Sequence, residues 1–371
     1  MATFIGCVML SNLSIAVETE IRPARPAVQT SGIAVRRAEL RVLWRTMLRI
    51  RRAEECIAEL AEAGQARCPC HLYIGQEAVA AGVCAALRDQ DSVWGGHRSH
   101  GHYLARGGSL EGLFAEVLGK ATGCSGGRGG SMHLLAREVG ILGTVPIVAG
   151  TVPLAAGAAL AYQLRGEPRV ACAFFGDGTL EEGHMHETMN LAALYRLPLL
   201  LVCENNLYSS HLHWSERRVL DNLHRAGEFH GVPGVRVDGN DVEAVLAAAR
   251  AAAHRAREGG GPTLIECRTF RFRGHVGPST DLDVGVKRRD ALDAWLEHDP
   301  LLRCEECLRA LGFEDLDGDT ASVEQETGAA LAAAEAAPFP EAARVLKHVW
   351  SSNPDGPYSP DGARREALCA R

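Results

Sequence analysis

The segment from residue 170 to residue 208 constrains the fold most strongly. Val170–Phe175 is an uninterrupted apolar run with the length of a strand that is buried on both faces, and Leu197–Cys203 is a second such run. Apolar residues between the two runs recur at roughly helical spacing. The first run ends in Gly176-Asp177-Gly178 and the second in Glu204-Asn205-Asn206. The segment therefore predicts a strand, a glycine turn, a helix and a second strand, with polar residues at both strand ends.

These polar residues predict a site for a magnesium diphosphate, because ligands of open parallel sheets bind at the carboxyl ends of the strands. Mg²⁺ takes about six oxygen ligands and usually shares them with phosphate groups. Asp177 offers a carboxylate, Asn206 an amide oxygen and the backbone near Tyr208 a carbonyl. Gly178 and Thr179 offer N–H groups at the start of a helix, where the helix dipole favours an anion.

The same segment resembles the thiamine diphosphate motif in the α subunits of 2-oxoacid dehydrogenase E1 components, of the pyruvate, branched-chain and acetoin types. GDG and NN at this separation, with a helix and a strand between them, are more specific than a lone glycine turn. Six further segments carry the resemblance: Cys70–Gly82, His97–Gly107, Gly119–His133, Ile147–Ala161, Phe270–His275 and Trp295–Leu301. The resemblance covers residues 36 to 350, so chance similarity does not explain it.

Strands that alternate with helices predict a doubly wound α/β fold, a mainly parallel sheet with helices on both faces. Beyond residue 208, two strands at Val235–Val237 and Pro262–Phe272 enclose a helix at Asp241–Arg257. Other helices are predicted at Arg36–Ala63, Gly75–Leu87, Leu110–Leu118 and Pro153–Leu164, and Asp290–Trp350 is mainly helical.

The chain divides into three parts. Residues 1–35 have few large apolar residues and no sustained period, which is typical of a disordered leader. From the resemblance, residues 36–350 are expected to form the thiamine diphosphate-binding domain with a helical C-terminal part, and residues 351–371 a frayed tail. Within the domain, Ser92–Gly108 is predicted as a polar loop. Gly119–Gly150 is predicted as a glycine-rich loop that wraps a ligand, because it holds more large apolar residues than a flexible linker would.

Two histidines take catalytic roles from the resemblance. His275 follows the last predicted strand in a glycine turn and matches a histidine at the mouth of the E1 active site. There it would transfer a proton or stabilise charge as the 2-oxo acid adds to the cofactor, and the sequence leaves open whether it is acid or base. His71 matches a histidine of the pyruvate-type subunits, and a cap on the helix that follows it is an equally good interpretation.

The resemblance also implies the cofactor contacts. Arg98 would bind the diphosphate, which suits the forked donors of a guanidinium, and its neighbour His97 stands where pyruvate-type subunits have a tyrosine. Val148 matches a backbone contact to the aminopyrimidine ring, although Pro146 replaces the usual glycine and offers no N–H. The remaining contacts are Gly176, Asp177, Gly178, Thr179, Asn206 and Tyr208, of which Asp177, Asn206 and Tyr208 would hold Mg²⁺.

Composition excludes several other classes. The net charge of −7 does not favour binding to nucleic acid or to an anionic membrane, and the arginines of Arg36–Arg52 read as the polar face of an amphipathic helix. No apolar run reaches the length of a membrane span. The twelve cysteines lack the paired spacing of a zinc site, so reduced thiols in a cytoplasmic protein are the better interpretation.

The resemblance also implies partners. Thiamine diphosphate needs a carboxylate near its pyrimidine ring, and in these E1 components that glutamate belongs to a β subunit. We therefore expect an α2β2 heterotetramer that decarboxylates a pyruvate-like 2-oxo acid and passes the acyl unit to a lipoyl E2. Arg273 and Val276–Ser279 depart from the HGHSxSD pattern of pyruvate-type subunits. A split transketolase-like or carboligase enzyme, which transfers a ketol or acyl unit to another acceptor, is the alternative function.

Overall fold

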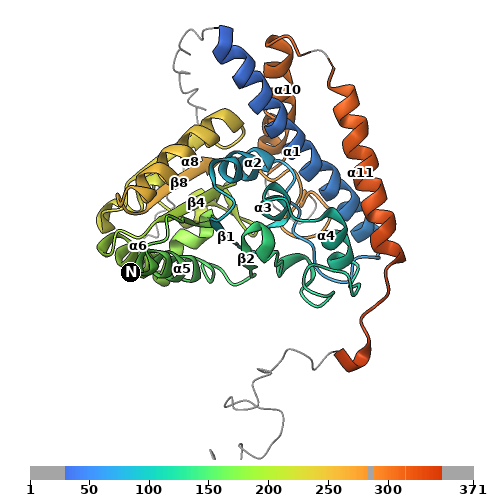
Figure 1. Ribbon diagram of the computed structural model, residues 1–371, viewed down its shortest axis with the longest axis horizontal. Coiled ribbons are helices and arrows are strands. Elements are labelled where there is room, and N and C mark those ends of the chain that lie inside the picture. Colours follow the sequence, from blue (N-terminus) through green and yellow to red (C-terminus); the bar gives the residue numbers. More distant parts are fainter. Residues whose placement is uncertain (1–29, 283–287, 314, 345–371) are drawn as a thin grey trace, which may run out of the picture.

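The computed structural model describes residues 30–282, 288–313 and 315–344, which form a parallel sheet flanked by helices (Figure 1). The six-stranded sheet has the order β2-β1-β3-β4-β8-β7, and all its pairings are parallel. Its strands are β1 (Ser92–Gly95), β2 (Ile141–Thr144), β3 (Ala171–Gly176), β4 (Leu199–Asn205), β7 (Gly234–Asp238) and β8 (Thr263–Arg268). A short antiparallel pair, β5 (Tyr208–Ser209) and β6 (Leu212–His213), follows β4.

The α-helices of the described residues are α1 (Thr30–Glu62), α2 (Glu77–Ala86), α3 (His100–Ala105), α4 (Leu110–Val117), α5 (Val152–Arg165), α6 (Gly183–Leu194), α7 (Trp214–Arg217), α8 (Val242–Arg257), α9 (Arg289–Leu296), α10 (Pro300–Ala310) and α11 (Asp317–Ala336). The 3-10 helices are η1 (Gly130–Met132), η2 (Arg137–Val139), η3 (Asp177–Glu181), η4 (Leu223–Arg225), η5 (Glu228–His230) and η6 (Ala342–Arg344).

Helices cover both faces of the sheet because successive strand residues point to opposite faces. On β3, Cys172 and Phe174 belong to the core on one face, which includes residues of α2 and α8. Ala173 and Phe175 belong to the core on the other face, with residues of α5 and α6. This arrangement confirms the predicted doubly wound α/β class.

The long helix α1 lies beside α10 and α11, away from the strands (Figure 1). Its apolar side packs against residues of both helices, and its arginines pair with carboxylates of α11. Arg41 Nε lies 2.7 Å from Asp319 Oδ2, and Arg49 Nε lies 2.9 Å from Glu326 Oε1. The arginine-rich segment is therefore the polar side of an amphipathic helix, as its spacing predicts.

The structure differs from the sequence predictions in three places. The first helix begins at Thr30, before the predicted start at Arg36, while residues 1–29 and 345–371 lie outside the described residues. The predicted loop Ser92–Gly108 is wrong, because it contains β1 and α3. The predicted loop Gly119–Gly150 contains β2. Both strands are too short to show a period, and pairing within the sheet decides their conformation.

The glycine-rich loop after α4 folds around the side chain of Glu116, which is 1% exposed. Its Oε2 accepts hydrogen bonds from the N–H groups of Ser125 (2.7 Å) and Gly127 (2.9 Å). Its Oε1 accepts from those of Gly129 (2.6 Å) and Gly130 (3.0 Å). The sequence predicts that this loop wraps a ligand. Between Ser125 and Gly130 the loop instead wraps the carboxylate of Glu116.

Within the described residues, no helix is both long enough and apolar enough to cross a membrane.

Candidate active site

The carboxyl ends of the parallel strands bring most of the predicted site residues to one edge of the sheet. Asp177 follows β3 and Asn206 follows β4, and the two strands pair Gly176 with Glu204. His97 and Arg98 follow β1, which pairs with β3 on one side and with β2 on the other. The chain thus leaves β1 and β3 in opposite directions across the sheet, and such a reversal creates a crevice where ligands bind.

Asp177 lies almost fully buried at this edge, where its carboxylate contacts two arginines. Arg217, the last residue of α7, forms an ion pair with Asp177 and a second one with Glu181. Nη2 of Arg218 lies 3.4 Å from the same Oδ2 of Asp177. The sequence interpretation missed both arginines because they lie beyond the β5–β6 hairpin. A buried carboxylate without a partner is strongly destabilising, so Asp177 requires a positive charge beside it.

The turn after β3 is closely packed. A Cβ atom added to Gly178 would lie 2.5 Å from Oγ of Ser209 on β5, so a larger residue at this position would displace the Ser209 side chain. An added Cβ at Gly176 would meet open space. Thr179 is buried in η3, and Tyr208 is buried beside Ser209. The backbone of this turn can therefore approach a ligand as the GDG motif predicts.

Asn206 is held by a glutamine that the sequence interpretation did not single out. Nδ2 of Asn206 donates to Oε1 of Gln76 at 2.9 Å, so its Oδ1 faces the other way and accepts weakly from the N–H of Tyr208 at 3.4 Å. Gln76 is fully buried, and its Nε2 has no hydrogen-bond partner among the described residues. A buried donor without an acceptor is unfavourable, and here it marks a place for a ligand oxygen. Gln76 lies in the Cys70–Gly82 segment, which could have identified it.

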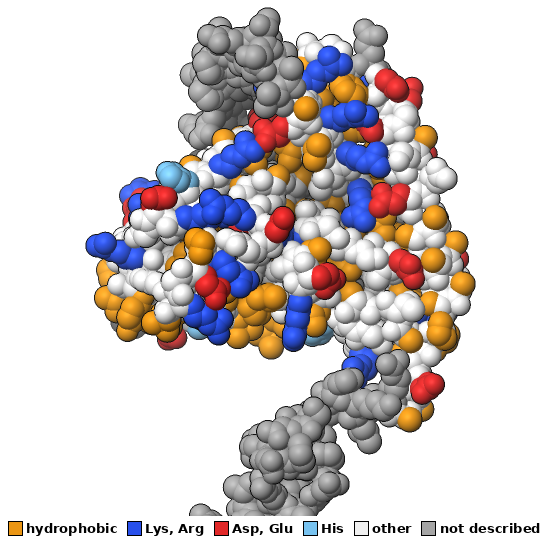
Figure 2. Space-filling view, viewed as in Figure 1, with side chains coloured by type: hydrophobic (Ala, Val, Ile, Leu, Met, Phe, Trp, Pro, Cys, Tyr) orange, Lys and Arg blue, Asp and Glu red, His pale blue; other side chains and the backbone are white. Residues whose placement is uncertain are grey.

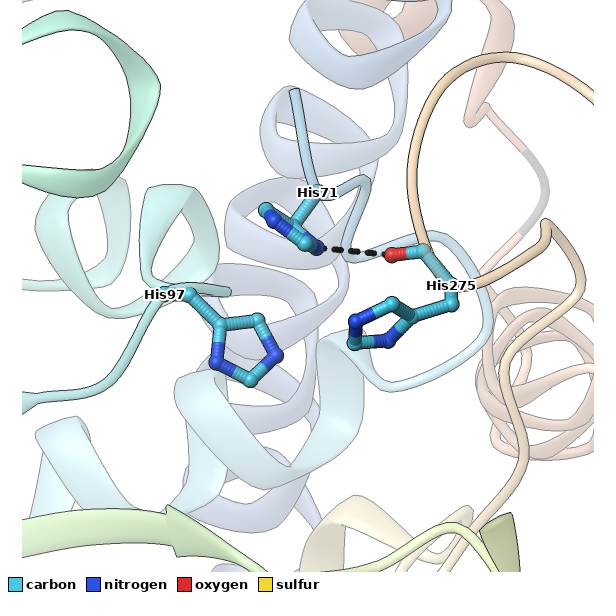
Figure 3. Close-up of side chains that lie close together, drawn as sticks. All are labelled: His71, His97 and His275. Atoms are coloured by element: carbon cyan, nitrogen blue, oxygen red, sulfur yellow. Dashed lines mark hydrogen bonds between the residues drawn. The ribbon is translucent and has the colours of Figure 1, made fainter. Parts of the chain in front are cut away.

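Three histidines from separate parts of the chain converge beside this edge (Figure 3). The ring centroids of His71 and His97 lie 4.5 Å apart, those of His71 and His275 4.9 Å, and those of His97 and His275 5.5 Å. Burial, together with the charge of Arg98, lowers the pKa of His71 to about 4, that of His97 to about 2 and that of His275 to about 3. All three imidazoles are thus neutral at neutral pH.

Nδ1 of His71 lies 2.7 Å from the backbone carbonyl oxygen of His275. Because a carbonyl oxygen only accepts hydrogen bonds, Nδ1 of His71 carries the proton and Nε2 keeps a free lone pair. The sequence left a helix cap as an alternative role for His71. In the structure the helix α2 has Gln76 as its N-cap, so His71 does not cap it.

Buried arginines surround the histidines. Arg98 donates to the carbonyl oxygens of Leu72 (2.6 Å) and His275 (2.9 Å), and burial lowers its pKa to about 10. Burial and the charges of Arg98 and Arg288 lower the pKa of Arg271. Nη1 of Arg271 is buried and has no hydrogen-bond partner among the described residues. Cationic groups that are buried together without enough acceptors favour an anionic ligand, such as a diphosphate or a carboxylate.

Val148 stands apart from these buried groups. It is 46% exposed in the loop between β2 and α5, next to Ala149, whose φ of 59° is in the left-handed region. Because β2 is the outermost strand on its side of the sheet, Val148 lies at the same carboxyl edge but at its periphery. Val148 is therefore exposed, whereas Asp177, Asn206, Arg98 and His71 are buried and His97 and His275 are half-buried.

His100 and His102 are fully buried in α3, where they have structural partners. Nδ1 of His100 lies 3.0 Å from Oε1 of Glu54, and its Nε2 lies 2.7 Å from Oγ of Ser131. Nε2 of His102 lies 2.9 Å from Oε1 of Glu204, at the end of β4. These contacts fix the segment after β1 and so position His97 and Arg98.

Comparison with known proteins gives consistent results. Residues 45–343 match the sequence model of the family described as dehydrogenase E1 component. The chain is 36% identical to the α subunit of acetoin:2,6-dichlorophenolindophenol oxidoreductase of Bacillus subtilis over 330 residues, which is 89% of this chain and 98% of the relative. It is 40% identical over 310 residues to the pyruvate dehydrogenase E1 component subunit α of Zymomonas mobilis, covering 82% of this chain and 86% of the relative. For the corresponding subunit of Porphyra purpurea the identity is 35%, over 88% of this chain and 97% of the relative.

Proposed function

The chain belongs to the dehydrogenase E1 component family, and from this membership we propose that it is the α subunit of an E1 that decarboxylates a 2-oxo acid with thiamine diphosphate. The observation that carries the proposal is the convergence of Asp177, Asn206, Arg98 and His275 at the edge of a doubly wound sheet. The relatives are named as subunits of pyruvate or acetoin enzymes. Nothing in these names favours the transketolase-like alternative.

The residues present fit a diphosphate cofactor. The unpartnered donors of Gln76 and Arg271 and the buried guanidinium of Arg98 suit the oxygens of an anion. The backbone at Gly176, Gly178 and Thr179 can approach a ligand closely, because the two glycines carry no side chain. When bound, thiamine diphosphate supplies the electron sink for the loss of carbon dioxide from the 2-oxo acid.

We propose that Asp177, Asn206 and the backbone carbonyl of Tyr208 hold Mg²⁺ with the diphosphate. The donor set of one carboxylate and two neutral oxygens suits Mg²⁺, which prefers hard oxygen ligands. Support comes from the charge balance at Asp177, which already has the cationic Arg217 as its partner. A magnesium ion would replace one positive charge beside this carboxylate by another, so the buried site stays compensated.

The histidines are proposed to move protons and to hold the substrate. His275 and His71, as neutral imidazoles, can each accept a proton or donate a hydrogen bond near the reacting carbonyl group. Arg98 and His97 would bind the diphosphate, and the Val148 backbone would contact the aminopyrimidine. The hydrogen bond from Nδ1 of His71 to the carbonyl of His275 keeps the two rings in a fixed relation.

Membership of this family also implies a β subunit and a lipoyl E2 as partners, and we propose an α2β2 assembly. Its support on this chain is an exposed apolar surface on α5, α6 and the loop before them. The surface consists of Ile147, Val148, Leu154, Leu164, Leu191, Leu194 and Tyr195, each at least 43% exposed. Hydrophobic side chains gather at the lower left of Figure 2, where Figure 1 places α5 and α6. Contiguous exposed apolar surface is typical of protein interfaces.

The compartment we propose is the cytoplasm. The ten described cysteines are free thiols, which suits a reducing environment.

Reconstitution tests the function. The purified chain should not decarboxylate pyruvate or another 2-oxo acid by itself, and its cognate β subunit should restore activity with thiamine diphosphate and Mg²⁺. An artificial electron acceptor replaces E2 in this assay. A chain with Asp177→Ala, mixed with the same β subunit, is the matched control and should stay inactive. Turnover of a 2-oxo acid by the isolated chain at the rate of the mixture would contradict the proposal.

A further inference from the structure

The three histidines described above lie close enough to share one ligand. One ring nitrogen of each of His71, His97 and His275 lies within 4.8 Å of those of the other two. The residues come from the segment before α2, the segment after β1 and the segment after β8, and their rings face one another in Figure 3. We propose that His71, His97 and His275 form a binding site for a divalent transition-metal ion of the Zn²⁺ class, separate from the magnesium ligands at Asp177.

The geometry of the first ligand is fixed by the protein. The proton on Nδ1 of His71 is donated to the carbonyl oxygen of His275, so the lone pair for a metal is on Nε2. In metal sites, the second ring nitrogen of a ligand histidine usually donates to a carbonyl or a carboxylate in this way, which orients the ring. His71 is 9% exposed, so little freedom remains for its ring.

The segment that carries His275 is fixed from both sides. The N–H of His275 donates to Oδ2 of Asp281 at 2.6 Å, and the N–H of Gly277 donates to the carbonyl oxygen of Cys70 at 2.8 Å. Arg98 donates to the carbonyl oxygen of His275 at 2.9 Å. These bonds tie the His275 segment to the His71 segment and to the residue that follows His97. A cluster whose backbone is held in this way can bind a metal with small ring movements.

Ligand chemistry decides which ion would bind. Three neutral imidazoles are borderline donors, which suit Zn²⁺, Co²⁺ and Ni²⁺ and are poor ligands for Mg²⁺. Three protein nitrogens leave a fourth position open for water or an anion. The positive charges of Arg98 and Arg271 oppose a cation here, and the carboxylate of Asp281 only partly offsets them. The site therefore favours a metal ion whose fourth coordination position is taken by an anion. Its affinity for the metal should be lower than that of a structural zinc site.

One consequence rests on the proposed function. If His71, His97 and His275 also serve the cofactor and substrate, the transition metal and thiamine diphosphate must exclude each other. Zinc bound to the three histidines would then block cofactor binding, and a chain that carries zinc would be inactive. The metal site itself follows from the geometry alone and does not depend on that reaction.

The test uses the full chain, freed of metals with a chelator and without thiamine diphosphate, so that Arg217 still pairs with the carboxylate of Asp177. Titration with Co²⁺ should give one equivalent with the visible absorption bands of a tetrahedral ion, and Zn²⁺ should bleach them. His97→Tyr keeps an aromatic ring but removes one ligand, and it should lower the affinity at least about tenfold. His254→Tyr, on an outer side of α8 with 79% of its side chain exposed, is the matched control and should bind normally.

The outcomes separate the two proposals. Absence of Co²⁺ binding, or binding that His97→Tyr leaves unchanged, would overturn the metal site. If His97→Tyr does not fold, as judged by circular dichroism, His275→Asn carries the same test. Loss of Co²⁺ binding in Asp177→Ala but not in His97→Tyr would place the ion at the magnesium ligands and also overturn it. Competition is measured by adding thiamine diphosphate to the Co²⁺-loaded chain. If the Co²⁺ absorption bands do not change, the metal and the cofactor do not exclude each other and the histidines do not serve the cofactor. The metal site itself would not be contradicted by that result.

Discussion

The guanidinium group of Arg217 forms an ion pair with the carboxylate of Asp177 at the carboxyl end of β3. Only 7% of the Arg217 side chain and 2% of the Asp177 side chain are exposed. The same carboxylate is the one that we propose as a ligand of Mg²⁺. In the chain without cofactor, Arg217 therefore provides the positive charge beside Asp177. Binding of Mg²⁺ to the Asp177 carboxylate would require the Arg217 guanidinium to move away from it.

The first prediction concerns this pair. Asp177→Ala should abolish tight binding of thiamine diphosphate with Mg²⁺, because it removes the only charged ligand of the proposed metal site. It should also lower the free energy of unfolding, by less than the roughly 3–5 kcal/mol that a fully unpaired buried charge costs, because Arg217 keeps its ion pair with Glu181. Calorimetry measures the first effect and urea unfolding the second.

The double variant Asp177→Ala with Arg217→Ala separates the two effects. It should regain much of the lost stability, since no buried guanidinium is left without its main partner, but it should not regain cofactor binding. Wild-type cofactor affinity in either variant would exclude Asp177 as a metal ligand.

The second prediction concerns Glu116, whose carboxylate accepts four backbone N–H groups from the loop between Ser125 and Gly130. Glu116→Ala should destabilise the chain by at least about 3 kcal/mol, because hydrogen bonds to a charged group contribute about 1.5–3 kcal/mol each. Limited proteolysis should then cut within residues 125–130. Glu116→Gln keeps one oxygen acceptor and should have the smaller effect. Unchanged protease resistance in Glu116→Ala would show that the loop does not depend on this side chain.

The parts of the fold and site that were predictable from sequence are those with a strong local pattern. The apolar runs that became β3 and β4 are buried along their whole length, so they could be recognised without knowledge of their neighbours. Polar residues directly after such strands must lie at the carboxyl edge of a parallel sheet, and Asp177 and Asn206 do. Their proposed roles as ligands remain predictions, because proximity alone does not identify a ligand.

The parts that were missed depend on contacts between distant segments. Gln76 is 130 residues from Asn206 and Arg217 is 40 residues from Asp177, and neither belongs to a local pattern that names its partner. The strand β1 has only four residues, so the sheet on both sides of it, and not its own sequence, determines its conformation. The glycine-rich loop could be recognised as ordered, but its centre, Glu116, lies in the preceding helix and gave no separate signal.

The third prediction concerns catalysis. His275→Ala should lower the turnover of the reconstituted enzyme by about 10²–10⁴, the usual range for a group that transfers a proton. The affinity for thiamine diphosphate should stay within about tenfold, because Arg98 and the donors at β3 remain. Steady-state kinetics with an artificial electron acceptor, together with calorimetry, measures both quantities. An unchanged turnover number would remove His275 from the catalytic group.

The last prediction concerns the reactivity of Cys68, which lies half-buried three residues before His71. A hydrogen bond from the Cys70 thiol, with further help from the N–H of Ser131 at 3.1 Å and from His100, lowers its pKa to about 7. Burial raises the pKa of Cys84, Cys172, Cys203, Cys267 and Cys304. Since the thiolate is the reactive form, Cys68 should be alkylated before these five at neutral pH.

The pH dependence of this alkylation has a definite sign. A thiol whose pKa is about 7 loses its proton as the pH rises through 7, so the rate of reaction of Cys68 with iodoacetamide should increase about tenfold from pH 6 to pH 8 and then level off. An unperturbed thiol would increase about a hundredfold over the same interval and continue to rise. Peptide mapping by mass spectrometry measures the rate at each pH. Cys70→Ala removes the hydrogen-bond donor and should move the profile of Cys68 to higher pH. A profile of Cys68 that keeps rising towards pH 9 in the unmodified sequence would show that its thiolate is not stabilised by these neighbours.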